Sequence, residues 1–139
     1  MFDCQIWIVD DDVDDLELIA QAFKDCSFDV RVFNASQAKD VIPALESTYR
    51  IDLPQVILLD INMPLISGKV LLEMIRRDDR FRHIPVVMFT TSNSRKDRIE
   101  CLQAGANSFL TKPVNYQQMI KICSSVATVF CSTEISNYS

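Results

Sequence analysis

Residues 56–64 read VILLDINMP, in which an unbroken apolar run, residues 56–59, ends at the acid Asp60. A short apolar run with branched side chains is typical of a strand that is buried on both faces. Beyond the following loop, Leu71, Met74 and Ile75 recur at the spacing of one helical face. The stretch therefore predicts a buried strand, a loop that begins with a carboxylate, and a helix.

The same alternation runs through the whole chain. Each expected strand is followed by apolar residues at helical spacing, and the strands are expected at residues 6–9, 30–33, 56–59, 85–89 and 108–110. The second strand is the most polar of the five, and Pro43 should kink or shorten the helix after it. Five strands alternating with five helices indicate one α/β domain, a doubly wound parallel sheet covered on both faces.

Composition excludes several classes of protein. The formal net charge is −5, and no basic run interleaves with aromatic residues, which argues against a nucleic-acid partner. No apolar stretch approaches the roughly 20 residues that span a bilayer, and the first residues lack the pattern of a signal peptide. Five scattered cysteines without a C-x-x-C pair indicate reduced thiols. We therefore expect a cytoplasmic protein that binds neither membrane nor nucleic acid.

Chemistry in such sheets is expected where the strands end, because ligands bind beyond the carboxyl ends of parallel strands. The polar residues found there are Asp10, Asp11, Asp12, Asp60, Thr90 and Lys112. Asp12 is better read as a helix cap. Carboxylates crowded into one crevice repel one another unless a cation is present, and Mg²⁺ suits oxygen ligands that also face a phosphate. Asp60 is then a plausible nucleophile for a phosphoryl group, with Lys112 and Thr90 binding the phosphoryl oxygens.

At this point the motifs resemble a known family. The sequence VDD at residues 9–11, LDINMP at 59–64 with Gly68, Thr90, and Lys112-Pro113 occur in the order and spacing of the receiver domain of two-component response regulators. The likeness is to single-domain receivers of the chemotaxis-regulator type. It covers residues 3–131 and leaves residues 132–139 as a flexible tail. It implies the flavodoxin-like strand order 2-1-3-4-5, in which the polar second strand lies at an edge.

The resemblance also implies a role for each site residue. Asp60 would be the phosphoacceptor, and Mg²⁺ would be held by Asp11, Asp60 and the backbone carbonyl of Asn62. Asp10 would act through a metal-bound water. Thr90 and Lys112 would bind phosphoryl oxygens, and Thr90 would form a switch with the aromatic Phe109. A cis peptide bond before Pro113 would aim Lys112 toward Asp60.

The resemblance implies partners as well, and two alternatives stay open. A sensor histidine kinase or a histidine phosphotransfer protein would supply the phosphoryl group, and the signal would leave by contact with another protein or a second copy. Such a protein is not an enzyme beyond its own phosphorylation and dephosphorylation. One alternative is a docking module that never sees phosphate. The other, a phosphatase of the haloacid-dehalogenase type, is disfavoured because Asn62 stands where those enzymes place a second Asp.

Overall fold

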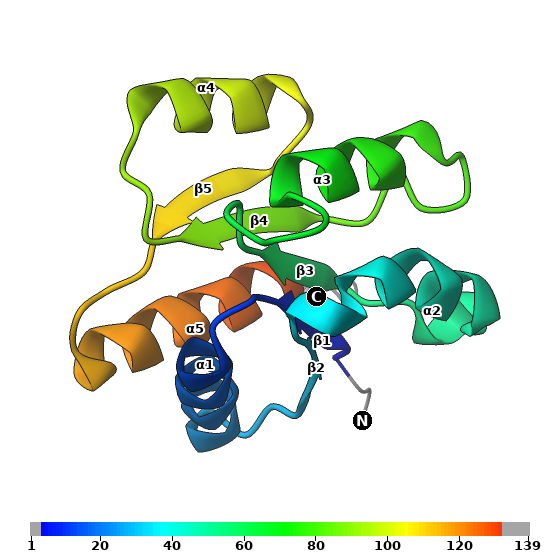
Figure 1. Ribbon diagram of the computed structural model, residues 1–139. Coiled ribbons are helices and arrows are strands. Elements are labelled where there is room, and N and C mark those ends of the chain that lie inside the picture. The colour runs from blue at the N-terminus through cyan, green and yellow to red at the C-terminus, as the bar shows by residue number, and fades with distance from the viewer. Residues whose placement is uncertain (1–3, 132–139) are drawn as a thin grey trace.

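The computed structural model describes residues 4–131, in which five parallel strands form one sheet with the order β2-β1-β3-β4-β5 (Figure 1). The strands are β1 Ile6–Val9, β2 Val30–Phe33, β3 Val56–Leu59, β4 Val86–Thr90 and β5 Ser108–Thr111. The α-helices are α1 Val13–Asp25, α2 Val41–Ser47, α3 Gly68–Arg77, α4 Arg95–Gln103 and α5 Tyr116–Cys131. The predicted fold class and strand order are confirmed. Residue 3 and the predicted tail, 132–139, lie outside the described residues.

The sheet separates two apolar cores. Helices α1 and α5 cover one face, and α2, α3 and α4 cover the other (Figure 1). Successive residues of β1 alternate between the cores: Ile6 and Ile8 pack with α1 and α5, whereas Trp7 and Val9 pack with α2 and α3. This alternation follows from the two-residue period of a strand, and it explains why the central strands are apolar throughout.

Strand β2 lies at the sheet edge, as its polarity indicated. Its residues Arg31 and Val32 are exposed, and the guanidinium of Arg31 lies 5.0 Å from the centre of the Trp7 ring on β1. Pro43 falls in the first turn of a short α2, which a 3-10 helix, η1 (Ala35–Asp40), precedes. A proline is tolerated there because the first amides of a helix have no partner within the helix. The helix is therefore shortened.

Helix ends follow the local sequence. Asp12, Ser67 and Ser94 each accept a hydrogen bond from a backbone amide three residues later and so cap α1, α3 and α4. Gly105 follows α4 with a φ of 109°, a left-handed conformation that favours glycine. The expected cap at Asp12 is present.

The expectation that all five cysteines are reduced thiols is wrong. Cys4 and Cys131 form a disulfide across 127 residues of sequence, although the scattered cysteines had indicated reduced thiols throughout. The pairing escapes local pattern because only the fold brings the start of β1 and the end of α5 together. Cys26, Cys101 and Cys123 are free.

No helix within residues 4–131 combines the length and apolar character needed to cross a bilayer.

Candidate functional site

Three carboxylates meet at the carboxyl edge of the sheet. Asp10 directly follows β1, Asp60 directly follows β3, and Asp11 completes a cluster whose ligand oxygens all lie within 4.8 Å of one another. Asp10 is 1% exposed and Asp60 is 6% exposed. The neighbouring Asp12 turns to α1 and accepts a hydrogen bond from the amide of Asp15. The sequence therefore assigned the cap and the cluster correctly.

Lys112 brings a buried positive charge to this cluster. Its Nζ lies 2.5 Å from Asp10 Oδ2, 2.7 Å from Asp15 Oδ2 and 3.7 Å from Asp60 Oδ2. Asp15 is absent from the site predicted from the sequence, and it is the Lys112 partner that sequence reasoning missed. Its place in the first turn of a helix that begins at the sheet edge was the available signal.

The peptide bond between Lys112 and Pro113 is trans, because no peptide bond within residues 4–131 is cis. The prediction of a cis bond is therefore wrong. The long side chain of Lys112 reaches Asp10 and Asp15 from a trans backbone, which is anchored by a 2.7 Å hydrogen bond from the Lys112 amide to the Thr90 carbonyl.

Burial is the main cause of the raised pKa values of Asp10 and Asp11. Desolvation raises the pKa of Asp10 to about 6, and the charge of Asp60 adds to that rise, while hydrogen bonds from Lys112 and from the Asp12 amide oppose it. Desolvation and the nearby Asp60 also raise the pKa of Asp11. Burial alone would lower the pKa of Lys112, but its bonds to Asp10 and Asp15 outweigh burial and raise it.

The pKa values of Asp10 and of Lys112 are both raised, although the two groups form one ion pair. Lys112 is shared by several carboxylates, so its charged form is stabilised. Asp10 has one cation, is almost fully buried and lies beside a second acid, so its charged form is disfavoured. The cluster therefore holds more negative charge than Lys112 compensates.

The donor set fits a hard divalent cation. Asp10, Asp11 and Asp60 supply carboxylate oxygens, and a cation would offset the burial and the mutual repulsion that raise the pKa values of Asp10 and Asp11. Asn62 is exposed in the loop after Asp60. Among the described residues no amide donates to its carbonyl, since the loop bonds run from the Met63 and Gly68 amides to the Ile61 carbonyl. That oxygen is thus available as a further ligand.

Asp60 is held in place by its own loop. The amide of Ile61 donates to Asp60 Oδ1 at 2.8 Å, and the amide of Asp60 donates to the Val9 carbonyl at 2.9 Å. Gly68, the first residue of α3, packs against the same backbone so tightly that a Cβ there would lie 1.9 Å from the Asp60 carbonyl oxygen. Only glycine fits, and its lack of a side chain lets α3 begin directly behind the acid.

Thr90 and Phe109 lie on the adjacent strands β4 and β5. The register pairs Leu59 with Met88, so Asp60 and Thr90 both stand at the carboxyl ends of neighbouring strands. Thr90 is fully buried, and its Oγ1 accepts a 3.3 Å hydrogen bond from the Ser92 amide. Phe109 pairs with Met88 and is 6% exposed, so its ring is inside the core.

Residues 6–124 match the family model of the response regulator receiver domain. The chain belongs to the receiver family. Receivers are signalling modules of two-component systems rather than classical enzymes, and as a family they accept phosphoryl groups from histidine kinases or phosphotransfer proteins. Receiver domains bind Mg²⁺ at an acidic pocket, and this chain has an acidic cluster of Asp10, Asp11 and Asp60 at the carboxyl edge of its sheet.

Similar proteins fall in the same family. The receiver is 39% identical to the response regulator PleD of Caulobacter vibrioides over 103 residues, which are 74% of this chain and 22% of PleD. It is 36% identical to the chemotaxis protein CheY-3 of Vibrio cholerae over 101 residues, 73% of this chain and 77% of CheY-3. The chain thus spans about a fifth of the length of PleD but most of the length of CheY-3.

Solved structures of response regulators have the same fold. The phosphorylated cyanobacterial phytochrome response regulator RcpA superposes with a TM-score of 0.81 at 26% identity, covering 95% of this chain and 96% of RcpA. The Mn²⁺-bound response regulator Rcp1 superposes with a TM-score of 0.77 at 26% identity, covering 94% and 96% of the two chains.

Proposed function

We propose that this receiver accepts a phosphoryl group on Asp60 in a Mg²⁺-dependent reaction and passes the signal on by contact with another protein. The observation that carries the proposal is the combination at one strand edge. Three carboxylates have ligand oxygens within 4.8 Å of one another, and the buried ammonium of Lys112 lies 3.7 Å from Asp60 Oδ2. An acidic cluster alone would suit a structural cation, but a buried lysine beside it suits the oxygens of a phosphoryl group.

The metal would be held by Asp11, Asp60 and the Asn62 carbonyl, with Asp10 acting through water. When bound, Mg²⁺ neutralises negative charge on the incoming phosphoryl group. Asp60 Oδ1 already accepts the Ile61 amide, so Oδ2, which faces Lys112, is the less constrained oxygen. A carboxylate oxygen of Asp60 would form the new bond to phosphorus. The bond between phosphorus and the donor would break, and the donor would leave with that electron pair.

Two further groups would bind the transferred phosphoryl group. Lys112 would turn from its acid partners toward one phosphoryl oxygen, and the Thr90 hydroxyl would donate to another. Both groups are buried, so their interactions with the anion would be little screened by water. A histidine kinase or a histidine phosphotransfer protein is the expected donor.

The test is phosphorylation by a small donor. We expect acetyl phosphate with Mg²⁺ to add one phosphoryl group, detected by intact-mass spectrometry, and neither Asp60→Asn nor metal-free protein to be labelled. Asp14→Asn, in an exposed acid of α1, is the matched control and should be labelled like the wild type. Labelling of Asp60→Asn at the wild-type level would place the acceptor elsewhere. No labelling of the wild type would favour the phosphate-independent docking module.

A further inference from the structure

Helix α4 is weakly anchored by apolar packing. Cys101 is its one fully buried side chain, while Ile99 and Leu102 are 42% and 40% exposed. A helix of this kind has no broad apolar face to fix its position on the sheet. Its place beside α3 must therefore depend on polar contacts to an unusual degree.

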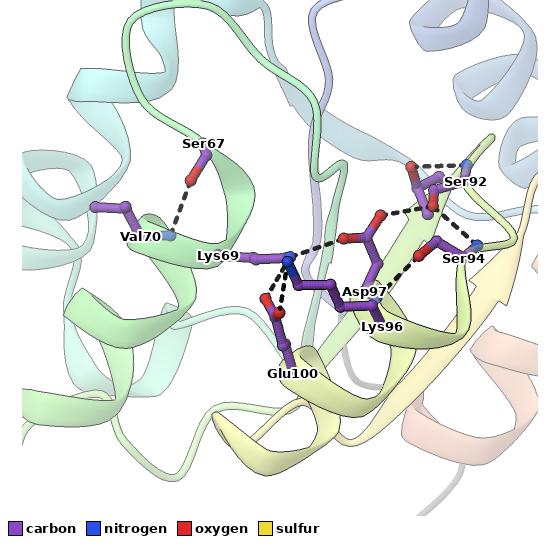
Figure 2. A network of polar contacts seen from close by, with 9 residues as sticks. Ser67, Lys69, Val70, Ser92, Ser94, Lys96, Asp97 and Glu100 are labelled. Carbon is purple, nitrogen blue, oxygen red and sulfur yellow. Dashed lines mark hydrogen bonds and ion pairs between the residues drawn. The ribbon is translucent and has the colours of Figure 1, made fainter.

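Those contacts come mainly from Lys69, the second residue of α3. Its Nζ lies 2.8 Å from Asp97 Oδ1 and 2.7 Å from Glu100 Oε2, both on α4 (Figure 2). The side chains of Lys69 and Asp97 are 26% and 23% exposed, so the pair is partly shielded from water. The hydrogen bonds raise the pKa of Lys69 and lower that of Asp97. One cation thus joins the two helices.

The same network reaches the phosphorylation site. The second oxygen of Asp97 accepts a 2.7 Å hydrogen bond from the Ser92 hydroxyl (Figure 2). The Ser92 amide donates in turn to Thr90 Oγ1 at 3.3 Å. At its other end, Lys69 follows Gly68, which packs against the backbone of Asp60. The network therefore runs from Thr90 at one end to the neighbour of Gly68, beside Asp60, at the other.

We propose that Ser92, Asp97, Glu100 and Lys69 form a latch that fixes α4 against α3 in the resting protein and loosens when Thr90 turns to a phosphoryl group. This inference rests on the proposed function, because it needs a ligand that draws the Thr90 hydroxyl toward Asp60. The bond from the Ser92 amide to Thr90 is the longest in the series, so it breaks first when Thr90 moves. Ser92 then loses one of the contacts that aim its hydroxyl at Asp97.

The chain offers a matched control for the latch. Arg77 and Glu73 form a 3.0 Å ion pair in which both residues belong to α3, with 76% and 47% of their side chains exposed. Arg77→Met therefore removes a cation from the same helix without removing a link to α4. Lys69→Met removes the link and retains the length of the side chain.

The first test is hydrogen exchange of the α4 amides, residues 95–103, with and without Mg²⁺ and beryllofluoride. In the wild type, we expect the mimic to accelerate exchange about five- to tenfold, the effect of losing two partly exposed ion pairs. Lys69→Met should exchange at the accelerated rate without the mimic, and the mimic should then add less than about twofold. Arg77→Met should behave like the wild type.

The second test uses the reciprocity of coupled equilibria. If the bound mimic loosens the latch, then a loosened latch must favour the mimic by the same factor. Lys69→Met should bind beryllofluoride about five- to tenfold more tightly than the wild type, a gain that lost packing alone would not produce. Asp97→Asn should show the same gain, and it provides a second variant if Lys69→Met fails to fold, because the cap on Ser94 uses the Asp97 amide.

These measurements distinguish an error in the proposed latch from an error in the proposed function. Fluorine NMR reports bound beryllofluoride directly, and no bound signal in the wild type would overturn the proposed function and the latch with it. A bound signal, together with unchanged α4 exchange and unchanged affinity in both Lys69→Met and Asp97→Asn, would overturn the latch alone.

Discussion

Replacing Asp10 by Asn should stabilise the metal-free protein, even though it removes an ion pair with Lys112. Asp10 is 1% exposed, and burial is the largest cause of its raised pKa. The attraction of Lys112 is already included in that value, so the ionised acid is a net cost to the fold. Asn has the same shape, cannot ionise, and can still accept the amide of Asp12.

The magnitude follows from the pKa. Its value of about 6 lies about two pH units above the ordinary 3.8, and at about 1.4 kcal/mol per unit this corresponds to about 3 kcal/mol of destabilisation above pH 7. Because the folded pKa exceeds the unfolded one, the folded state binds the proton more tightly. Stability from this group is therefore fully present below about pH 4 and is lost as the pH rises through about 6.

Thermal unfolding in the presence of a chelator measures the difference. At pH 8, we expect Asp10→Asn to melt about 10 °C above the wild type, with the gap closing below about pH 4. Millimolar Mg²⁺ should narrow the gap, because the charge of Asp10 would strengthen metal binding through water and the metal would then stabilise the folded wild type more than the variant. Asp14→Asn serves as the control and should change stability by less than about 0.5 kcal/mol. A lower melting temperature for Asp10→Asn at pH 8, or a gap independent of pH, would refute this reasoning.

Three further perturbations test the surrounding structure. Gly68→Ala should lower the free energy of unfolding in urea by about 3 kcal/mol or more, because a Cβ 1.9 Å from the Asp60 carbonyl oxygen must displace the loop. The displaced loop should also slow phosphorylation of Asp60. Wild-type stability in this variant would contradict the close packing. Leu65→Gly should stabilise the fold by about 0.5–1 kcal/mol in the same assay, since Leu65 has a φ of 67° and is 91% exposed. Cys4→Ser should lower stability by about 5 kcal/mol in the absence of reductant, the entropy of a loop spanning 127 residues. Equal unfolding curves for that variant and the wild type would show that Cys4 and Cys131 are not joined.

The fold was predictable because each element carries its own signal. The apolar β1 and β3 are typical of central strands, and the more polar β2 is typical of an edge strand. The complete strand order was implied by the resemblance to receivers. The site followed from the fold, because Asp10, Asp60 and Lys112 each directly follow a parallel strand and the ends of such strands meet. Local pattern and one topological rule were sufficient for these residues.

The remaining contacts join residues that no local pattern relates. Asp15 reaches Lys112 across 97 positions, and Lys69 reaches Asp97 across 28. Helical spacing indicates which face of a helix is polar, but not which distant charge that face will meet. The disulfide between Cys4 and Cys131 has the same origin. The trans bond before Pro113 was missed for another reason, since a flexible lysine can reach its partners from more than one backbone geometry.

The meeting of Cys4 and Cys131 also determines how this receiver can be joined to other domains. Their Cα atoms lie 5.5 Å apart, beside the amino end of β1, whereas Asp10 and Asp60 lie at the opposite, carboxyl edge of the sheet. A fusion partner attached before Cys4 and another attached after Cys131 would leave the domain from one point. Fluorescent proteins placed at these two positions would therefore sit next to each other and leave the cluster of Asp10, Asp11 and Asp60 uncovered.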